Sequence, residues 1–502
     1  MKRDIFSTIF IVFMAVALLP VLPEKTPKAN AGENKSFQET KINIGANKKD
    51  EIFFPGSVST NASDSTHFAY LIKKNEKFQV KIDGKEGSFY DRVAKGTPFF
   101  NQDGSRNLYI AYRGKKALVV SDGKEQPLFD GIDMPVFSPD GTRLAYRAQI
   151  NGKQMVVEDG ISIQSFDGII GMPVFSPDSK HLAFIGVKEK KVAVVLNSRI
   201  IMKDCENVKE ITFSPDSKKL AFTMKQNGLW FIARDKKISK KGYHNIQNLL
   251  FSPDSERFIF VAQSGQDIFV VENDIESEHY TTVGPPLFSP DGKRLAFPVL
   301  SGKTWKVVLD GKKGPEFKQI AAPKFSPDSK RFAHSGITGN DKGAIIINNN
   351  EIRTYDSTDQ PVFSPDSNHL AYRVRKGQKW FMVMDEKTGL PYDGVRMPIF
   401  SPDSATIAYP AVDSKGLFMV TNEKPGKPYQ LIGLPWFSPK DGHLAYKAKD
   451  KDGWMLVING VECKERFDGF LTNEPIVFKD RLCHVLALDK ENLDFFRYEV
   501  RF

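Results

Sequence analysis

The sequence is poor in cysteine: it has only Cys205, Cys463 and Cys483 among its 502 residues. Three cysteines cannot supply the disulfide framework of a small stapled domain, so that class of fold is excluded. Cys463 and Cys483 fall in adjacent repeats of the pattern described below and could pair in an oxidising compartment. The alternative is that all three are buried as apolar side chains.

Long apolar runs are also scarce. One uncharged run covers residues 5–22, behind two basic residues, and no later stretch is apolar for long enough to span a bilayer. Small residues at 29–31 resemble a cleavage site. Residues 1–31 are therefore interpreted as a signal peptide or, if they are not cleaved, as an N-terminal anchor. We expect an extracytoplasmic protein, periplasmic or secreted.

Recognisable catalytic motifs are missing too. The chain has no Gly-x-Ser-x-Gly elbow, no phosphate-binding loop and no His-Glu-x-x-His segment. Four of the eight histidines recur at one repeat position, where other copies carry lysine or arginine and where we expect an exposed strand: His67, His181, His369 and His443. We therefore predict no catalytic, cofactor-binding or metal-binding residue and no cofactor.

The composition is otherwise that of a folded protein, with 40% hydrophobic and 26% charged residues. The 39 phenylalanines suggest one packing position that is used many times. A formal net charge of +10 favours anionic partners such as phospholipid headgroups, acidic glycans or an acidic protein, without indicating specific nucleic-acid binding.

The strongest feature of the sequence is a repeat. The string Phe-Ser-Pro-Asp-(Gly or Ser) begins at Phe137, Phe175, Phe213, Phe251, Phe288, Phe325, Phe363 and Phe400, with a variant at Phe437. A small residue usually follows eight positions later, as at Ala145, and we call this position the small-residue slot. Degenerate copies place Ala69 and Leu108 in the slot upstream and Cys483 downstream. Twelve units of about 38 residues fill nearly everything after the N-terminal segment.

Each unit predicts four short antiparallel strands. In one copy, residues 135–137 and 143–146 form the first two strands around a type I turn of Ser138-Pro139-Asp140-Gly141. Six copies have serine at the fourth corner, as a type I turn without positive φ there would allow. Residues 155–157 form the third strand, and a following Asp-Gly or Asn-Gly predicts a tight hairpin to the fourth. Four strands in about 38 residues match a β-propeller blade.

These units resemble the WD40-like β-propeller repeats of the TolB type, which also occur in propellers of the prolyl-oligopeptidase class. The resemblance covers about residues 50–502. No α/β domain precedes the repeats, as it does in TolB, and no hydrolase domain follows them. The resemblance therefore implies an all-β propeller that binds a partner.

The number of rings is left open by the sequence. Residues 32–50 contain a spare strand at 40–44 that can complete a C-terminal blade. Because rings of four to eight blades are usual, we expect two propellers, residues 51–275 and 276–502, in a six-plus-six or five-plus-seven arrangement. The alternative is one large ring.

A candidate binding face follows from the topology. The turns between second and third strands, together with the links between units, share one side of a propeller and carry cations and tryptophans. The tryptophans recur at one repeat position, where they are either an aromatic binding rim or a seal between blades. The candidate partner-binding residues are Lys190, Lys191, Lys225, Lys303, Lys376, Lys379, Lys449, Lys451, Trp230, Trp305, Trp380 and Trp454.

The predicted function is an exported binding or scaffold protein that recruits a protein or an anionic envelope component through this loop face. The alternative is an enzyme, a glycan lyase or hydrolase, with its active site in a propeller funnel. A third interpretation is a sensory domain anchored by an uncleaved N-terminal helix.

Overall fold

The computed structural model describes residues 37–45, 51–54, 57–60, 67–235, 237–470, 476–479, 481–489 and 494–502. These residues form 57 strands in twelve antiparallel sheets, and none of them is in an α-helix. No helix in this part of the chain is long and apolar enough to cross a membrane. The expected signal peptide or anchor, residues 1–31, lies outside the described residues.

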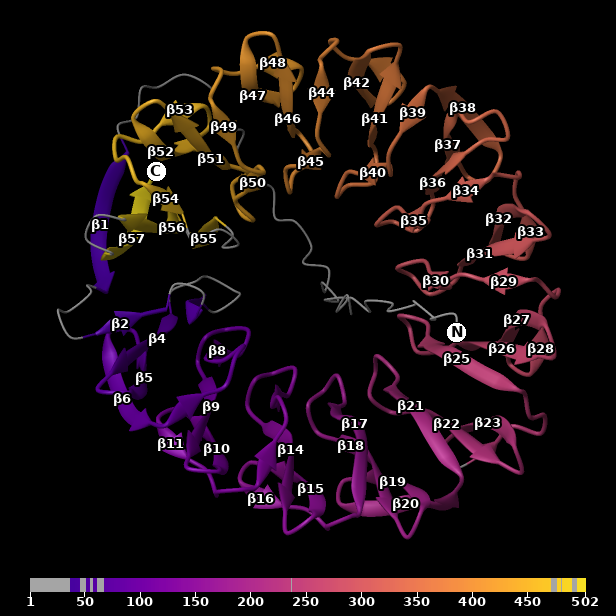
Figure 1. The fold of residues 1–502 in the computed structure, drawn as a ribbon. Helices are drawn as coiled ribbons and strands as arrows, with labels where there is room; N and C mark the ends of the chain where they lie inside the picture. Colours follow the sequence, from indigo (N-terminus) through magenta and orange to yellow (C-terminus); the bar gives the residue numbers. More distant parts are fainter. Residues whose placement is uncertain are drawn as a thin grey trace, which may run out of the picture. The chain divides into compact units, whose positions relative to one another are not determined.

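Residues 37–502 form one compact unit, in which the twelve sheets are the blades of a ring (Figure 1). The predicted β-propeller fold and its twelve blades are confirmed. The blades make a single ring in place of the two propellers that we expected. The expected division at 275/276 falls inside strand β28 (Ile275–Glu276), where β27 (Asp267–Glu272) packs on β29 (Thr282–Val283) of the next blade and the stacking simply continues.

Each blade has two long central strands. The second strands of blades 1 to 12 are β4 (Phe68–Lys74), β9 (Asn107–Arg113), β14 (Leu144–Ile150), β18 (Leu182–Lys188), β22 (Leu220–Gln226), β26 (Phe258–Ser264), β31 (Leu295–Ser301), β36 (Phe332–Ile337), β41 (Leu370–Lys376), β46 (Ile407–Asp413), β51 (Leu444–Asp450) and β56 (Leu482–Asp489). The third strands are β5 (Lys77–Ile82), β10 (Lys116–Ser121), β15 (Lys153–Glu158), β19 (Lys191–Leu196), β23 (Leu229–Arg234), β27, β32 (Thr304–Leu309), β37 (Gly343–Ile347), β42 (Lys379–Met384), β47 (Gly416–Thr421), β52 (Gly453–Ile458) and β57 (Asp494–Arg501).

The outermost strands are mostly short. They are β6 (Lys85–Tyr90), β11 (Lys124–Glu125), β16 (Ile161–Ser162), β20 (Arg199–Cys205), β24 (Lys237–Ile238), β28, β33 (Lys312–Lys313), β38 (Glu351–Tyr355), β43 (Lys387–Thr388), β48 (Lys424–Pro425), β53 (Val461–Glu462) and, in blade 12, β1 (Gln38–Gly45). A short edge strand offers few unpaired backbone groups to another chain.

The innermost strand is continuous in blades 4, 5 and 6, as β17 (Gly168–Phe175), β21 (Asn207–Phe213) and β25 (Asn245–Phe251). In the other blades it is two short pieces, commonly with a proline between them, because proline cannot donate to the ladder. The pieces are β2 (Ile52–Phe53) and β3 (Ser59–Thr60), β7 (Arg92–Val93) and β8 (Phe99–Phe100), β12 (Gly131–Ile132) and β13 (Val136–Phe137), β29 and β30 (Leu287–Phe288), β34 (Gln319–Ile320) and β35 (Lys324–Phe325), β39 (Ser357–Thr358) and β40 (Val362–Phe363), β44 (Gly394–Val395) and β45 (Ile399–Phe400), β49 (Leu431–Ile432) and β50 (Trp436–Phe437), and β54 (Gly469–Phe470) and β55 (Val477–Lys479).

The two ends of the repeat array meet in blade 12. Strand β1 pairs antiparallel with β57, from Gln38 opposite Arg501 onward. The Tyr498 hydroxyl donates a hydrogen bond of 2.5 Å to Glu39, which also accepts the Lys464 amide at 3.0 Å. The N-terminal strand therefore completes the C-terminal blade.

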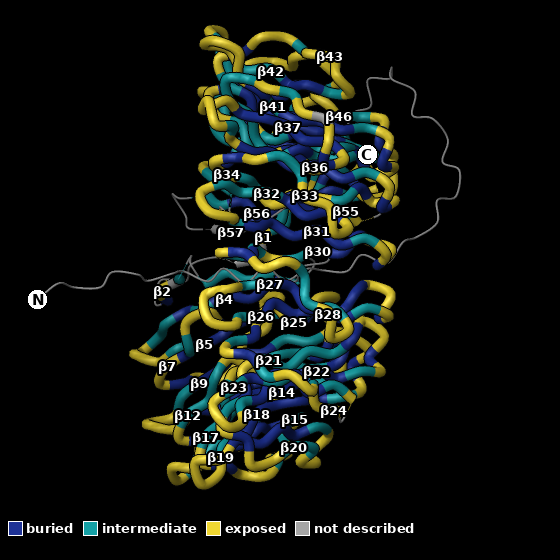
Figure 2. Tube along the Cα trace, turned by 90° about the vertical axis from the view of Figure 1, so that its right-hand side faces the viewer, coloured by how far each residue is buried: buried dark blue, intermediate teal, exposed yellow. Residues whose placement is uncertain are grey.

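The core lies between the blades, where buried segments fill the middle of each sheet and exposed residues gather at the turns (Figure 2). Ala145 and the alanines in the same slot of other blades are fully buried, because the face of the next blade packs directly on them. The three cysteines are buried and free, so Cys463 and Cys483 are not paired.

The slot in the last blade is one residue away from its predicted place. Val477 pairs with His484 as Val136 pairs with Ala145, so His484 occupies the slot and Cys483 does not. The turn before this strand is shorter than in the other blades, which a constant spacing of eight residues could not reveal.

The Ser-Pro-Asp turns also differ from the prediction at their fourth corner. Ser179, Ser217 and Ser255 have φ of 63°, 63° and 64°, in the left-handed region that glycine adopts at Gly141. Serine is therefore not there because the turn avoids positive φ. The predicted Asp-Gly hairpins are confirmed, with φ of 50° at Asp83 and 76° at Gly84.

Candidate binding rim

The candidate lysines and tryptophans lie at the turns between second and third strands, on the rim that we call the basic rim. We expected a loop face there. The connections are tight hairpins instead: Ile150 pairs with Lys153 around a two-residue turn, and Lys188 pairs with Lys191 in the same way. The turns of blades 1 to 7 and 9 to 11 have two residues, whereas the turn between Ile337 and Gly343 in blade 8 has five, so the rim varies mainly in sequence.

Strand register brings several candidates together. Lys225 is directly opposite Trp230, and Lys449 is directly opposite Trp454. Lys376 faces Lys379 across its hairpin, and Trp380 is opposite Arg375. Side chains opposite one another in antiparallel strands are neighbours. Cation and indole are therefore close together within blades 5, 9 and 11.

Three of the four tryptophan rings contact other side chains of this protein. Trp230 is 5% exposed and belongs to the apolar cluster between blades 5 and 6, with the Lys209 Nζ 4.1 Å from the centre of its ring. The Arg373 guanidinium lies 5.0 Å from the Trp380 ring, and Trp454 meets Phe470 of the next blade edge-on at 6.2 Å. The apolar cluster around Trp230 and the Trp454–Phe470 contact are those of a seal between blades, whereas Lys209 and Arg373 each belong to the same blade as the tryptophan that they contact.

Lys379 has a structural partner. Its Nζ lies 2.5 Å from Asp393 in the link to the next blade, and the same ion pair recurs in blades 1, 2, 3 and 8. In the blade 3 copy, Asp167 also accepts the amide of Glu189, in the next blade, at 2.7 Å. Hydrogen bonds from Lys153 and from that amide lower the pKa of Asp167. The pair links neighbouring blades.

The other seven candidate lysines have no such partner. Among the described residues, no carboxylate lies within ion-pair distance of Lys190, Lys191, Lys225, Lys303, Lys376, Lys449 or Lys451. Lys191 stands where Lys153 stands in blade 3, but the residue fourteen positions further on is Cys205 instead of an aspartate. These lysines are distributed over blades 4, 5, 7, 9 and 11, so they form a rim and not one pocket.

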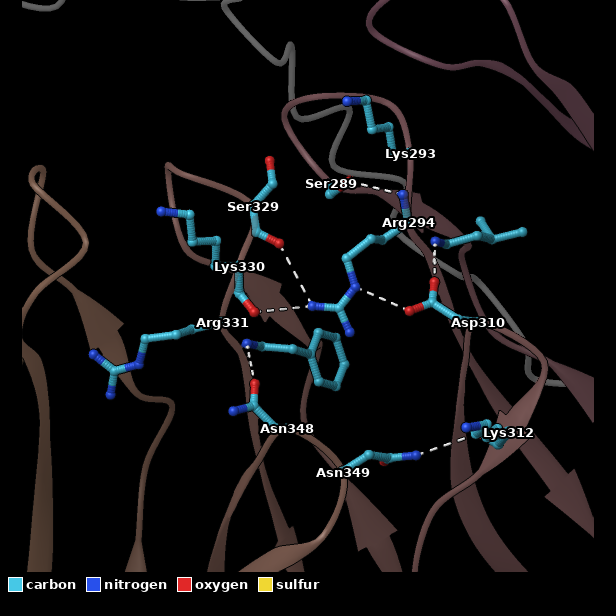
Figure 3. Close-up of polar contacts among 12 residues, drawn as sticks. Ser289, Lys293, Arg294, Asp310, Lys312, Ser329, Lys330, Arg331, Asn348 and Asn349 are labelled. Atoms are coloured by element: carbon cyan, nitrogen blue, oxygen red, sulfur yellow. Dashed lines mark hydrogen bonds and ion pairs between the residues drawn. The ribbon is translucent and has the colours of Figure 1, made fainter.

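A second link between blades was missed by the sequence analysis (Figure 3). Arg294 in blade 7 donates from Nε to Asp310 at 2.9 Å and from Nη1 to the Lys330 carbonyl of blade 8 at 3.1 Å. Its guanidinium lies 5.4 Å from the ring centre of Phe325, the phenylalanine of the next Phe-Ser-Pro-Asp string. Arg143, Arg257 and Arg331 contact the next blade in the same way.

Histidine takes the same place in other blades. The rings of His181 and His369 stack on Phe213 and Phe400 of the next blade, each at 6.4 Å between ring centres. The position is therefore an inter-blade contact, and our expectation of a merely exposed strand position was wrong. The signal in the sequence was the restriction of this position to arginine, lysine and histidine in most copies.

Among the described residues, no group of three or more His, Cys, Asp and Glu side chains is placed to hold a metal ion. A groove of about 870 Å³ lies between blades 6 and 7 and is lined by the Arg257–Glu272 and Arg294–Asp310 ion pairs together with Ile275. It belongs to the Ser-Pro-Asp side of the blades and does not include the basic rim.

No protein-family model and no curated protein matches the chain. Solved structures that it resembles include the hydrazine synthase of Kuenenia stuttgartiensis (14% identity, 58% of this chain and 95% of that one, TM-score 0.22). The propeller of Dos1 (12%, 67% and 91%, 0.27) and an Agrobacterium tumefaciens protein assigned as TolB (14%, 45% and 93%, 0.24) are also similar.

These likenesses are too distant to indicate a ligand. The repeat sequence resembles the WD40-like propeller repeats of the TolB type, and the structure shows a propeller of twelve blades. A fold alone does not determine a function, because function depends on the site that the fold carries.

Proposed function

We propose that this chain is an exported binding or scaffold protein that recruits a protein or an anionic envelope component through the basic rim. The observation that supports this most directly is the division among the rim lysines. Lys379 is held in an ion pair, whereas Lys376, Lys449 and Lys451 have no carboxylate partner among the described residues. Lys376 lies over the rings of Tyr355 and Phe381, at 5.6 and 5.9 Å, but its charge is not neutralised by a carboxylate. Cations without a carboxylate partner remain available to an anionic partner.

The tight hairpins support the same proposal. A two-residue turn fixes the backbone on both sides of each lysine, so little backbone entropy is lost when a partner binds. Because the lysines are spread over several blades, the proposed partner is an extended anionic surface or an acidic protein, in preference to a small ligand.

The test is charge reversal on the rim. The variant Lys376→Glu, Lys449→Glu, Lys451→Glu removes three unpaired cations and leaves the Lys379–Asp393 pair intact. We expect it to lose most of the capture of partners from an envelope extract and most of the binding to vesicles rich in phosphatidylglycerol. Vesicles of phosphatidylcholine provide the baseline.

The matched control makes the same change in net charge on the side of the ring that carries the Ser-Pro-Asp turns. Lys180, Lys218 and Lys330 are exposed there, and their reversal to glutamate should leave binding unchanged. Equal loss in both variants would mean that net charge, and not the rim, controls binding. Binding that persists in the rim variant would contradict the proposal.

A further inference from the structure

One interface between blades differs from all the others. Eleven interfaces contain an apolar cluster to which both blades contribute, as Ala145 and Val156 of blade 3 pack with Phe184 of blade 4. At the interface of blade 12 with blade 1, which we call the seam, the described residues form no shared cluster. Phe68, Tyr70 and Ile72 cluster only with Val58 of their own blade.

On the blade 1 side of the seam, a lysine replaces an aliphatic residue. In blade 1, Tyr70 pairs with Lys81. The equivalent pair in blade 3 is Tyr146 with Val157, and both of these side chains pack on the preceding blade. Lys81 therefore faces blade 12. The equivalent residues of blades 2 to 11 are all aliphatic: Val120, Val157, Val195, Ala233, Val271, Val308, Ile346, Val383, Val420 and Val457.

This lysine is buried as an ion. Lys81 is 5% exposed, and its Nζ lies 2.7 Å from Glu51, itself 8% exposed, and 3.3 Å from Glu86. Burial acts to lower the pKa of Lys81, but hydrogen bonds with Glu51 and Glu86 outweigh it and raise the pKa. The ammonium group therefore stays charged inside the interface.

The blade 12 side shows two replacements of the same kind. His484, 1% exposed, fills the slot that alanine, leucine or isoleucine fills in the other blades. In blade 12, Leu486 pairs with Arg497. The equivalent pair in blade 3 is Arg147 with Val156, and Val156 packs on the following blade. Arg497 therefore faces blade 1, where the other eleven blades carry valine, isoleucine, leucine or methionine; its Nε lies 2.8 Å from Glu499.

Ionic groups at an interface between two blades lower the free energy that is needed to separate the blades. Separating two apolar faces exposes hydrocarbon to water, which is unfavourable in proportion to the area. Separating faces that carry Lys81, Glu51 and Arg497 returns charges to water and recovers part of the desolvation penalty that burial imposed. The seam therefore resists opening less than the apolar interfaces do.

We propose that the ring opens at the seam, by separation of the facing surfaces of blades 12 and 1, while the other eleven interfaces stay closed. Strand β1 remains in blade 12 during this opening, and its covalent connection to β2 keeps the two blades tethered. The open state exposes the innermost strands of blades 1 and 12 from the side.

Thiol labelling under native conditions tests the proposal. Ile72, 2% exposed, faces the seam, and Ala148, 1% exposed, holds the same position on blade 3. We expect Ile72→Cys to react at least ten times faster than Ala148→Cys, with the sites distinguished by mass spectrometry from the buried native cysteines. Equal rates would overturn the proposal.

A second pair of cysteine variants keeps the test valid if one variant of the first pair fails to fold. Leu486→Cys on blade 12 should react faster than Ile185→Cys, its equivalent on blade 4. The replacement Lys81→Val, Glu51→Leu, Arg497→Val restores aliphatic side chains and should slow labelling at Ile72→Cys by a similar factor, without affecting Ala148→Cys. An unchanged rate at Ile72→Cys, or faster labelling at β1 and β57 positions than at Ile72→Cys, would contradict opening between the faces.

Discussion

The hydroxyl of Ser179 accepts a hydrogen bond of 3.0 Å from the backbone amide of Asp140, although the two residues belong to the turns of different blades. The same link joins five further pairs of turns: Asp178 to Ser217, Asp216 to Ser255, Asp291 to Ser329, Asp328 to Ser367 and Asp366 to Ser404. This hydrogen bond between turns explains why serine occupies a corner whose positive φ suits glycine better.

Replacing Ser179 separates these two effects. Ser179→Ala removes the acceptor and leaves a Cβ at positive φ, so we expect a loss of roughly 1–2 kcal/mol in the free energy of unfolding. Ser179→Gly loses the same hydrogen bond but relieves the left-handed conformation, which costs an L-residue about 1 kcal/mol. The glycine variant should therefore unfold at a higher urea midpoint than the alanine variant. The reverse order would show that the left-handed backbone conformation at this corner costs alanine little.

Arg294 should behave as a contact between blades and not as a surface charge. Arg294→Lys keeps the charge but cannot reproduce the planar fork that reaches Asp310 and the Lys330 carbonyl. We expect a loss of about 1 kcal/mol, measured by urea denaturation. Lys293→Ala, at the exposed neighbouring position, is the control and should leave the midpoint unchanged. Equal stability of Arg294→Lys and the native protein would contradict this role.

The repeat could be predicted from the sequence because its turns require particular residues at particular corners. Proline, aspartate and glycine fix the corners wherever they occur, so Ser138 to Gly141 alone predicts two strands and the turn between them. The ring count could not be predicted in this way, because eleven interfaces share one packing pattern and no local sequence feature records how many blades follow one another.

The candidate site was readable only in part. The proximity of Lys225 to Trp230 follows from hairpin register, which the sequence contains. The ion pair of Lys379 with Asp393 could not be distinguished from the unpaired state of Lys376, because it depends on how the link to the next blade folds back. Arg294 was missed for the same reason, since its partners lie one blade further on.

Gly186 provides a test of packing between blades. A Cβ built on Gly186 would lie 2.5 Å from the ring of Phe166, and its φ is not in the left-handed region. Gly186→Ala should therefore lower stability by roughly 1–3 kcal/mol through overpacking. Gly168→Ala is the matched control, because its Cβ would meet Val187 at 3.9 Å, an ordinary contact. A thermal melt that ranks the two variants equally would contradict the close approach of Phe166.

His334 should make the stability of the ring depend on pH. It is fully buried between Phe317 and Phe332, at a position where blade 7 has Phe297, and burial lowers its pKa from 6.5 to about 4. In the unfolded chain the imidazole takes up a proton as the pH falls below about 6.5, whereas in the folded chain it does so only near pH 4. The stabilisation is therefore complete above pH 6.5 and is lost progressively as the pH falls toward 4.

The expected loss over that interval is roughly 3 kcal/mol, from about 1.4 kcal/mol for each pH unit. His334→Phe should remove this part of the pH dependence when urea midpoints are compared between pH 4 and pH 7. The reciprocal variant Phe297→His places an imidazole at the equivalent position of blade 7 and should introduce a similar dependence. If His334→Phe and the native protein lose stability in parallel as the pH falls, the buried imidazole is not its source, because only the native protein carries this group.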